Sequence, residues 1–257
     1  MAGRVFDDPP VLCGHRGMGR GVVDGHAENT LASCHAAIAA GLRWVEVDVR
    51  TTKDDVLIAA HYPTLDDGRF YADLTSDEIG ADGLLRIEDL LDDLPAHIAV
   101  DLDIKSSLED ALRPADATTA ALVGRLARRE VRRRRLLVTS FDPAALLIAR
   151  GEAPEAAYGL LTWVRFPLRK SIPAARHLGL DVVAAHVGSF SANDTDSAPV
   201  HREAEWSVRV AHEAGLEVAA WCPTTEQMPA MVAAGVDCLV VNDVRAAVSV
   251  LADVRAV

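Results

Sequence analysis

The sequence predicts a TIM barrel, an α/β fold in which eight parallel strands close into a ring inside a shell of helices. Short apolar runs alternate with alanine-rich helical runs along most of the chain, and such alternation is typical of a parallel sheet. Several of the apolar runs are nearly continuous, as expected for strands covered on both faces. The length of 257 residues also suits one such barrel, which needs about 250 residues.

Nine segments have the composition of strands, and helical patterns fill most of the gaps between them. The strand segments are residues 11–15, 44–50, 56–61, 98–105, 136–141, 157–162, 182–186, 217–222 and 238–242. The helical segments are residues 30–40, 87–94, 115–129, 143–150, 172–178, 204–214, 225–234 and 246–255. Gly41, Gly215 and Gly235 follow three of these helices, where the left-handed residue that ends a helix favours glycine.

Nine strands are one too many for the barrel, and the chain spacing identifies the extra one. Only five residues separate the runs at 44–50 and 56–61, whereas parallel neighbours need a connection of about a dozen residues or more. These runs therefore predict an antiparallel hairpin that extends the second strand and leaves eight strand–helix repeats. The hairpin centre near Lys53 and Asp54 places His61 roughly opposite Glu46.

The chain is expected to form a single domain over residues 1–257, because no linker-like stretch divides it. Residues 62–86 are rich in Asp and Gly and predict a small insertion over one mouth of the barrel. The apolar stretches fall far short of the roughly 20 residues needed to span a bilayer. The N-terminus lacks the apolar region of a signal peptide. We therefore expect no transmembrane segment and a cytoplasmic location.

Charge and cysteine content limit the partners. The formal net charge of −12 argues against a nucleic-acid surface, since phosphate backbones bind basic fields. An anionic substrate must then find a local positive site inside an acidic protein. Cys13, Cys34, Cys222 and Cys238 stand singly in apolar stretches, without the close pairing of a zinc or redox motif, and we expect reduced core residues.

Polar side chains gather at the carboxyl ends of the strands, which is where the active site of a TIM barrel lies. They comprise two histidines, three carboxylates, an arginine, a lysine and an indole. These residues are His15, Arg16, Glu46, Asp48, His61, Asp103, Lys105 and Trp221. Glu46 and Asp48 are two residues apart and so share one face of a strand. Asn242 and Asp243 end the last strand, where they either orient a metal shell or cap the following helix.

Each of these residues also has a structural interpretation. A lone histidine at a strand end is more often structural than catalytic. Glu46 and Asp48 could form a salt-bridged layer, and Asp103 and Lys105 could pair with each other. Their occurrence together favours a functional site, because burying so many charged groups in one place is costly unless a metal or ligand organises them. All-oxygen ligation suits Mg²⁺ or Ca²⁺ better than Zn²⁺.

Four short motifs, in this order, resemble the glycerophosphodiester phosphodiesterases. They are Gly-His-Arg-Gly at 14–17, Glu-Asn-Thr at 28–30, Glu-Val-Asp-Val at 46–49 and His-Tyr-Pro-Thr-Leu at 61–65. Motif order and spacing make the resemblance specific, and it covers nearly the whole chain. It implies a TIM barrel with a small insertion after the hairpin.

The chain departs from the family pattern at three places. The family's Glu-x-Lys is Asp-Ile-Lys at 103–105, a version similar to that of the related sphingomyelinase-D-like phospholipases. The Asp that usually follows the second histidine is Tyr62, and the Trp-Thr-Val-Asn segment reads Trp-Cys-Pro-Thr at 221–224. These departures leave the core of the reaction in place and bear on the identity of the substrate.

The resemblance and the chemistry of the residues together imply metal-dependent hydrolysis of glycerophosphodiesters to an alcohol and glycerol phosphate. Glu46, Asp48 and Asp103 would hold one divalent cation, Mg²⁺ or Ca²⁺. His15 and His61 would act as general acid and general base, and the sequence does not say which does which. By resemblance, a substrate hydroxyl attacks first and gives a cyclic phosphate that water then opens.

Four further residues would bind the substrate. Arg16 and Lys105 supply positive charge for the phosphate. The planar guanidinium of Arg16 can donate hydrogen bonds to two phosphate oxygens at once. Trp221 forms an apolar wall against the glycerol or the head group. Asn29 is a plausible N-cap for the first helix, and the resemblance implies that it also faces the site.

Two other functions stay open. A phospholipase-D-like hydrolase of lysophospholipids would need an exposed apolar rim, for which residues 62–86 offer only Phe70, Tyr71 and a few aliphatic side chains. A barrel that binds phosphodiesters or polyols without cleaving them would be indicated by loss of a histidine or a metal ligand, and every such position is filled. We expect a soluble small-molecule phosphodiester as the partner, and the oligomeric state is left open.

Overall fold

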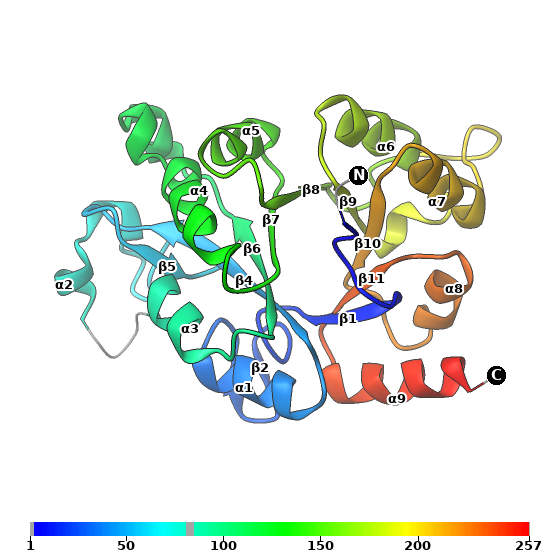
Figure 1. Cartoon of the computed structure of the whole chain (residues 1–257), viewed down its shortest axis with the longest axis horizontal. Helices are drawn as coiled ribbons and strands as arrows, with labels where there is room; N and C mark the ends of the chain where they lie inside the picture. The colour runs from blue at the N-terminus through cyan, green and yellow to red at the C-terminus, as the bar shows by residue number, and fades with distance from the viewer. Residues whose placement is uncertain (1–2, 81–84, 257) are drawn as a thin grey trace.

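Eight parallel strands close into a barrel, which confirms the fold that the sequence predicts. The computed structural model of the protein describes residues 3–80 and 85–256. The ring closes because β1 pairs with both β4 and β11, and helices surround it (Figure 1). The strands of the ring are β1 (Val11–Gly14), β4 (Trp44–Thr51), β6 (Ala99–Ile104), β7 (Leu136–Ser140), β8 (Ala157–Leu161), β9 (Val182–His186), β10 (Glu217–Trp221) and β11 (Cys238–Val241).

The helices that follow the strands mostly begin where the sequence places a capping side chain. Thr30, Thr118, Asp142 and Asp243 each accept a hydrogen bond from a backbone N–H in the first turn of the helix that follows. The longer helices are α1 (Leu31–Ala39), α3 (Ile87–Asp93), α4 (Thr119–Glu130), α5 (Pro143–Glu152), α6 (Leu168–His177), α7 (Ala204–Glu213), α8 (Met228–Ala233) and α9 (Val244–Arg255).

Two helices differ most from their predicted bounds. The run at 115–129 splits into a 3₁₀ turn (Ala115–Ala117) and α4, because the extended Thr118 ends the turn and caps the helix. The helix predicted at 172–178 begins at Leu168 and contains Pro173. Leu168 is buried together with Ile172, so packing of this face extends the helix in front of the proline.

Beyond the barrel, β4 pairs antiparallel with β5 (Leu57–Ala59). Val49 lies opposite Ala59, and the Ala60 N–H donates to the Asp48 carbonyl oxygen (3.0 Å). Continued from these pairs, the register puts His61 one residue from the predicted position opposite Glu46, and its Nδ1 lies 3.2 Å from Asp48 Oδ1. The shift arises because the turn between Thr52 and Val56 is centred on Asp54.

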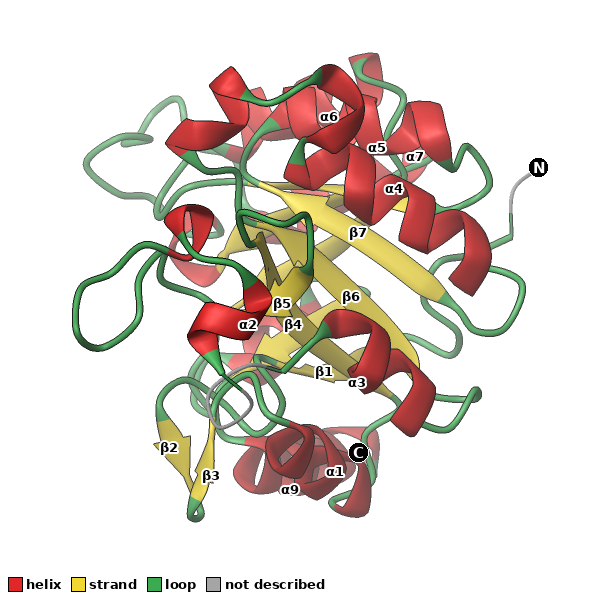
Figure 2. Cartoon of the chain, turned by 90° about the vertical axis from the view of Figure 1, so that its left-hand side faces the viewer, coloured by secondary structure: helices red, strands yellow, loops and turns green. Residues whose placement is uncertain are grey.

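The segment after the hairpin lies on the side of the molecule opposite to the N-terminus (Figure 2). It contains a 3₁₀ turn (Tyr71–Asp73) and α2 (Ser76–Ile79). The backbone N–H and hydroxyl of Ser76 donate to the Asp54 carboxylate (2.9 and 2.8 Å), which ties α2 to the tip of the hairpin. Residues 81–84 of the predicted insertion lie outside the described residues. A ribbon of β2 (Val22–Val23) and β3 (His26–Ala27), which the sequence does not predict, lies on the same side.

The inside of the barrel holds its own apolar cluster, separate from the core between strands and helices. At its amino end the rings of Phe6 and Trp44 lie 5.2 Å apart, and Phe6 is almost fully buried. The Glu217 carboxylate accepts backbone N–H bonds from Val5 (2.5 Å) and Phe6 (3.0 Å). These bonds hold the N-terminal segment under the strands, so that Phe6 closes that end of the barrel.

Replacing Phe6 with Ala should lower the free energy of unfolding by about 3–5 kcal/mol, the usual cost of emptying a buried aromatic site. Denaturant unfolding measures this loss. The matched control is Phe70→Ala, which removes an exposed ring and should cost less than about 1 kcal/mol. Equal losses in the two variants would show that Phe6 does not close the barrel.

Candidate active site

The structure brings the predicted site residues together at the carboxyl ends of the strands. Seven of the nine line one cavity of about 460 Å³. They are His15, Arg16, Glu46, His61, Asp103, Lys105 and Trp221. Asn29 and Asp48 lie behind its wall and contact each other, since Asn29 Nδ2 donates to Asp48 Oδ2 (2.8 Å) and the Asp48 N–H donates to Asn29 Oδ1 (3.1 Å). Asn29 is not the N-cap of α1, because Thr30 fills that position.

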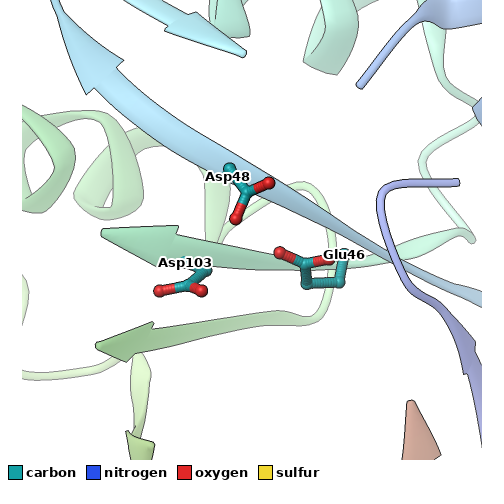
Figure 3. A group of neighbouring side chains, drawn as sticks. All are labelled: Glu46, Asp48 and Asp103. Carbon is teal, nitrogen blue, oxygen red and sulfur yellow. The ribbon is translucent and has the colours of Figure 1, made fainter. Parts of the chain in front are cut away.

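Three carboxylates turn toward one another at the centre of the site (Figure 3). Glu46 and Asp48 come from β4, and Asp103 comes from β6, where it is the register partner of Asp48. One oxygen of each lies within 4.8 Å of the other two, and all three side chains are buried. The two-residue period of β4 and the parallel register thus assemble the cluster without any loop.

Asp48 is the most heavily bonded of the three carboxylates. Arg16 Nε lies 3.0 Å from Asp48 Oδ2, while Lys105 Nζ (2.9 Å) and His61 Nδ1 (3.2 Å) lie near Oδ1. Burial opposes ionisation of this carboxyl. The hydrogen bond from His61 and the charges of Lys105 and Arg16 outweigh burial and hold the pKa of Asp48 well below its usual range.

Glu46 and Asp103 are left short of partners. Glu46 Oε2 accepts the Arg16 N–H (2.8 Å), and Asp103 also pairs with Lys105. Glu46 Oε1 and Asp103 Oδ1 are buried without a hydrogen bond to any of the described residues. Burial and the neighbouring carboxylates raise the pKa of Glu46 well above its usual value. Burial also raises the pKa of Asp103 to about 6, against the opposing charge of Lys105. Buried carboxylate oxygens that lack a hydrogen bond are suited to binding a hard divalent cation.

Asp101 is a fourth carboxyl inside the barrel and was not predicted as a site residue. It precedes Asp103 by two residues on β6 and so lies on the same face of the strand. Its carboxyl accepts a hydrogen bond from the Thr139 hydroxyl (2.8 Å). Burial, together with Glu46 and Asp103, raises its pKa well above the usual value. The two-residue spacing from Asp103 is the signal that could have found it.

His15 is oriented by two residues from the last strands. Its Nδ1 lies 2.6 Å from Asn242 Oδ1, which also accepts the Arg20 N–H (3.1 Å), so Nδ1 carries the proton. Nε2 then faces the carboxylates, 3.9 Å from Glu46. Asn242 therefore orients a site histidine, a role that was not predicted from the sequence, and Asp243 caps α9, one of the two roles that were predicted.

Cys222 belongs to the site, and the expectation that it is a core residue is wrong. It is only partly buried, its sulfur lies 3.7 Å from His15 Nδ1, and it accepts a hydrogen bond from Asn242 Nδ2 (3.1 Å). Burial opposes both charged forms, but the contact between the two groups raises the pKa of His15 and lowers that of Cys222. The departure at 221–224 was the available signal. Cys13, Cys34 and Cys238 are buried, as expected.

Both the side chain and the backbone of His61 are held by hydrogen bonds. Its Nδ1 contacts Asp48, and its carbonyl oxygen accepts two bonds from the Arg50 guanidinium (3.0 and 2.7 Å). Tyr62, the departure from the family pattern, packs edge-on against the imidazole at 4.9 Å. The imidazole is therefore fixed on the hairpin side of the cavity.

The loop after β1 needs both glycines of its Gly-His-Arg-Gly motif. A Cβ on Gly14 would lie 2.1 Å from the Gly17 carbonyl oxygen, and one on Gly17 would clash with Ser33. Between them Arg16 adopts a left-handed backbone (φ 56°) that aims its N–H at Glu46. Its guanidinium pairs with Glu28 (2.9 Å) as well as Asp48.

An aromatic wall faces the charged side of the cavity. Trp221 lies 5.9 Å from Phe141 and 4.4 Å from His186, and Phe141 stacks on Trp163 at 4.7 Å. Burial and the charge of Arg165 lower the pKa of His186, so this wall is uncharged near neutral pH. Trp163 and Phe141 were not singled out from the sequence, although each lies at or just beyond a strand end.

The chain matches the model of the glycerophosphoryl diester phosphodiesterase family over residues 15–246. The chain belongs to this family. The enzyme class predicted from the sequence, a glycerophosphodiester phosphodiesterase, is thereby confirmed. No protein with a curated description matches the chain. Among the described residues, the helices are all too short or too polar to cross a membrane.

Solved structures of similar fold carry related names. One from Silicibacter pomeroyi DSS-3, described as a glycerophosphoryl diester phosphodiesterase, is 25% identical with a TM-score of 0.78 and matches 97% of this chain and 96% of that chain. An Oleispira antarctica phosphodiesterase in complex with the product sn-glycerol-3-phosphate is 21% identical, with a TM-score of 0.74 over 95% and 97%. A glycerophosphodiester phosphodiesterase from Thermotoga maritima is 18% identical, with a TM-score of 0.71 over 93% and 97%. The last two show the fold alone.

Replacing Asn242 with Ala should lower kcat by roughly 10- to 100-fold with little change in KM, as expected when a catalytic side chain loses the group that orients it. Nitrogen NMR of His15 gives an independent readout. The parent phosphodiesterase should show the tautomer protonated at Nδ1, and the variant a mixture of tautomers. An unchanged tautomer and an unchanged kcat would contradict this role for Asn242.

Proposed function

We propose that this phosphodiesterase hydrolyses glycerophosphodiesters to an alcohol and glycerol phosphate, using one divalent cation and two histidines. The observation that carries the proposal is the pair of buried, unpartnered oxygens on Glu46 and Asp103, in the cavity that His15 and His61 also line. The oxygens are suited to a cation and the imidazoles to proton transfer. Both requirements of phosphodiester cleavage are thus met within one cavity.

Glu46, Asp48 and Asp103 would hold the cation. Their all-oxygen donor set favours Mg²⁺ or Ca²⁺. When bound, the ion supplies positive charge to a phosphoryl oxygen. Lys105 and Arg16 already lie against these carboxylates, so they bring the local positive charge that an anionic substrate needs in a protein of net charge −12.

The two histidines would share the proton transfers. Asn242 fixes the Nδ1 proton of His15 and leaves Nε2 free to accept or donate a proton. Asp48 holds His61 at Nδ1 in the same way. Each imidazole therefore offers one nitrogen, and their different supports, a neutral amide and a carboxylate, suit them to different steps of acid–base catalysis.

Lysophospholipid hydrolysis is a second candidate, because an apolar rim does exist. The loop after β8 exposes Trp163, Val164 and Phe166, at 68%, 54% and 36% of their full surface. This rim was not predicted from the sequence, where only residues 62–86 offered apolar side chains for that role. The product bound by the Oleispira antarctica relative supports a small-molecule phosphodiester in preference to a lipid. The single-domain extent of residues 1–257 and the cytoplasmic location stay predictions.

A product assay tests the proposed function. The protein is incubated with glycerophosphocholine, glycerophosphoethanolamine, glycerophosphoglycerol and a lysophospholipid, each with Mg²⁺ or Ca²⁺. Release of glycerol phosphate and free alcohol from a glycerophosphodiester is expected. Cleavage of the lysophospholipid alone would favour the second candidate, and no cleavage of any of the four would contradict both.

Excess chelator should abolish the activity, and Mg²⁺ or Ca²⁺ should restore it. The same ion should raise the melting temperature, because a ligand that binds only the folded state stabilises it. Glu46→Gln should weaken both effects, since it removes a charged oxygen from the cluster. Full turnover in excess EDTA, with no metal found by elemental analysis, would rule out a metal-dependent reaction.

Changing His15 or His61 singly to Ala should lower kcat by roughly 10² or more. The metal-dependent rise in melting temperature should persist in both variants, because the carboxylates are intact. His97→Ala is the matched control, since His97 is exposed and directly precedes the amino end of β6. Near-parental turnover in either site variant would defeat the two-histidine mechanism.

A further inference from the structure

The cavity continues past the catalytic residues into the inside of the barrel. Its upper part contains the carboxylates and the histidines, but its lining also reaches residues near the amino ends of the strands. We call this lower part the lumen chamber. It is lined by Phe6, Trp44, Leu137, Ala184, Ala219 and Cys238.

The lumen chamber exists because small residues stand where a TIM barrel normally has large ones. Bulky branched side chains usually fill the interior in layers. Here Ala184 on β9 and Ala219 on β10 are register partners, and both line the cavity. These two positions contribute little side-chain volume, and Leu137 and Phe6 line the cavity nearer its amino end.

One side of the cavity is apolar from its rim to this floor. Trp163 stands at the rim, Phe141 and Trp221 below it, and Ala219 and Leu137 deeper. From Trp221 to Ala219, the deepest residue of β10 in the lining, is two residues, or about 7 Å of strand at roughly 3.3 Å per residue. The depth is enough for an extended chain of several carbons.

Polar groups are few on the described surface of the lumen chamber. The Asp101 carboxyl accepts the Thr139 hydroxyl bond, and the thiols of Cys13 and Cys238 are small and weakly polar. Glu46 borders this part of the cavity, because it is the register partner of Asp101, whereas Asp103 and Lys105 lie nearer the mouth. The remaining lining is mostly apolar, and such a surface takes up apolar groups in preference to water.

We propose that the lumen chamber binds the organic group esterified to the phosphate opposite the glycerol, and that this group is an uncharged, unbranched apolar alcohol. The proposal rests on the proposed function, because it places the phosphate of a glycerophosphodiester at the carboxylates. It names the substrate class: the leaving alcohol is apolar, in contrast to a charged amino alcohol such as ethanolamine. The aromatic wall then guides the chain from the rim to Ala219.

A chain-length series tests the proposal. The substrates are glycerophosphodiesters of methanol, butanol, hexanol and octanol, compared with glycerophosphoethanolamine. For each methylene that enters the lumen chamber, kcat/KM should rise about threefold to fourfold, as expected for burying one methylene, until the chamber is full. A flat series, or preference for the ethanolamine ester at every length, would overturn the proposal while leaving the proposed function standing.

A variant that fills the lumen chamber gives a matched comparison. Ala219→Met should lower the ratio of kcat/KM for the octyl ester to that for the ethanolamine ester by at least about tenfold, since several buried methylenes lose their place. Ala230→Met makes the same change at an exposed position of α8 and should keep the parent ratio. An unchanged ratio in Ala219→Met would place the alcohol outside the barrel and overturn the proposal.

Binding of 1-hexanol, measured by calorimetry, separates the proposal from the proposed function because it needs no turnover. The parent should bind one molecule with a negative heat-capacity change, the mark of apolar burial, and Ala219→Met should bind at least about tenfold more weakly. If no glycerophosphodiester is hydrolysed but hexanol binds in this way, the proposed function fails and the apolar site stands. If the parent does not bind hexanol, the apolar site is refuted.

Discussion

The active site depends on the buried carboxylate of Asp48. It contacts four groups that come from four different segments: Arg16 after β1, Asn29 before α1, His61 after β5 and Lys105 after β6. A fully buried charge is stable only when such partners surround it. Each of the four partners is also a predicted functional residue. The contacts that stabilise the buried charge of Asp48 therefore also hold these residues in place in the site.

The same arrangement leaves the other two carboxylates without enough positive partners. The cations of the cluster, Arg16 and Lys105, are already drawn to Asp48, so Glu46 Oε1 and Asp103 Oδ1 remain buried without partners. Their pKa values are raised mainly by burial and further by the repulsion between the carboxylates. A divalent cation would relieve it, since three carboxylates and two basic side chains then carry a net positive charge suited to a phosphodiester.

Much of this site could be predicted because it lies on strands. The two-residue period joins Glu46 to Asp48, and parallel register brings Asp103 beside them. The barrel followed from alternation and spacing. His61 lies one residue from its predicted position, because the turn is centred on Asp54 and the predicted centre lay between Lys53 and Asp54.

Other features depend on contacts between residues that are far apart in the sequence, and no local sequence pattern predicts these contacts. Cys222 reads as one more apolar residue, and only the fold brings its sulfur to His15. The alanines at 184 and 219 are ordinary strand residues in sequence, and their effect on the barrel interior emerges when β9 and β10 stand side by side. The exposed Trp163 was not predicted as part of an apolar rim, because it follows β8 and does not belong to the insertion.

The central claim is that the unpartnered oxygens of Glu46 and Asp103 bind a divalent cation, and proton release on metal binding tests it most directly. Ligand carboxylates must ionise to bind a metal, so carboxyls with raised pKa values lose protons when it enters. Calorimetric titration of Mg²⁺ and Ca²⁺ in two buffers of different ionisation enthalpy counts these protons. With the pKa of Asp103 at about 6, we predict saturable binding of one ion, with more protons released at pH 6 than at pH 8. No saturable binding, or binding with no proton release at pH 6, would contradict the account.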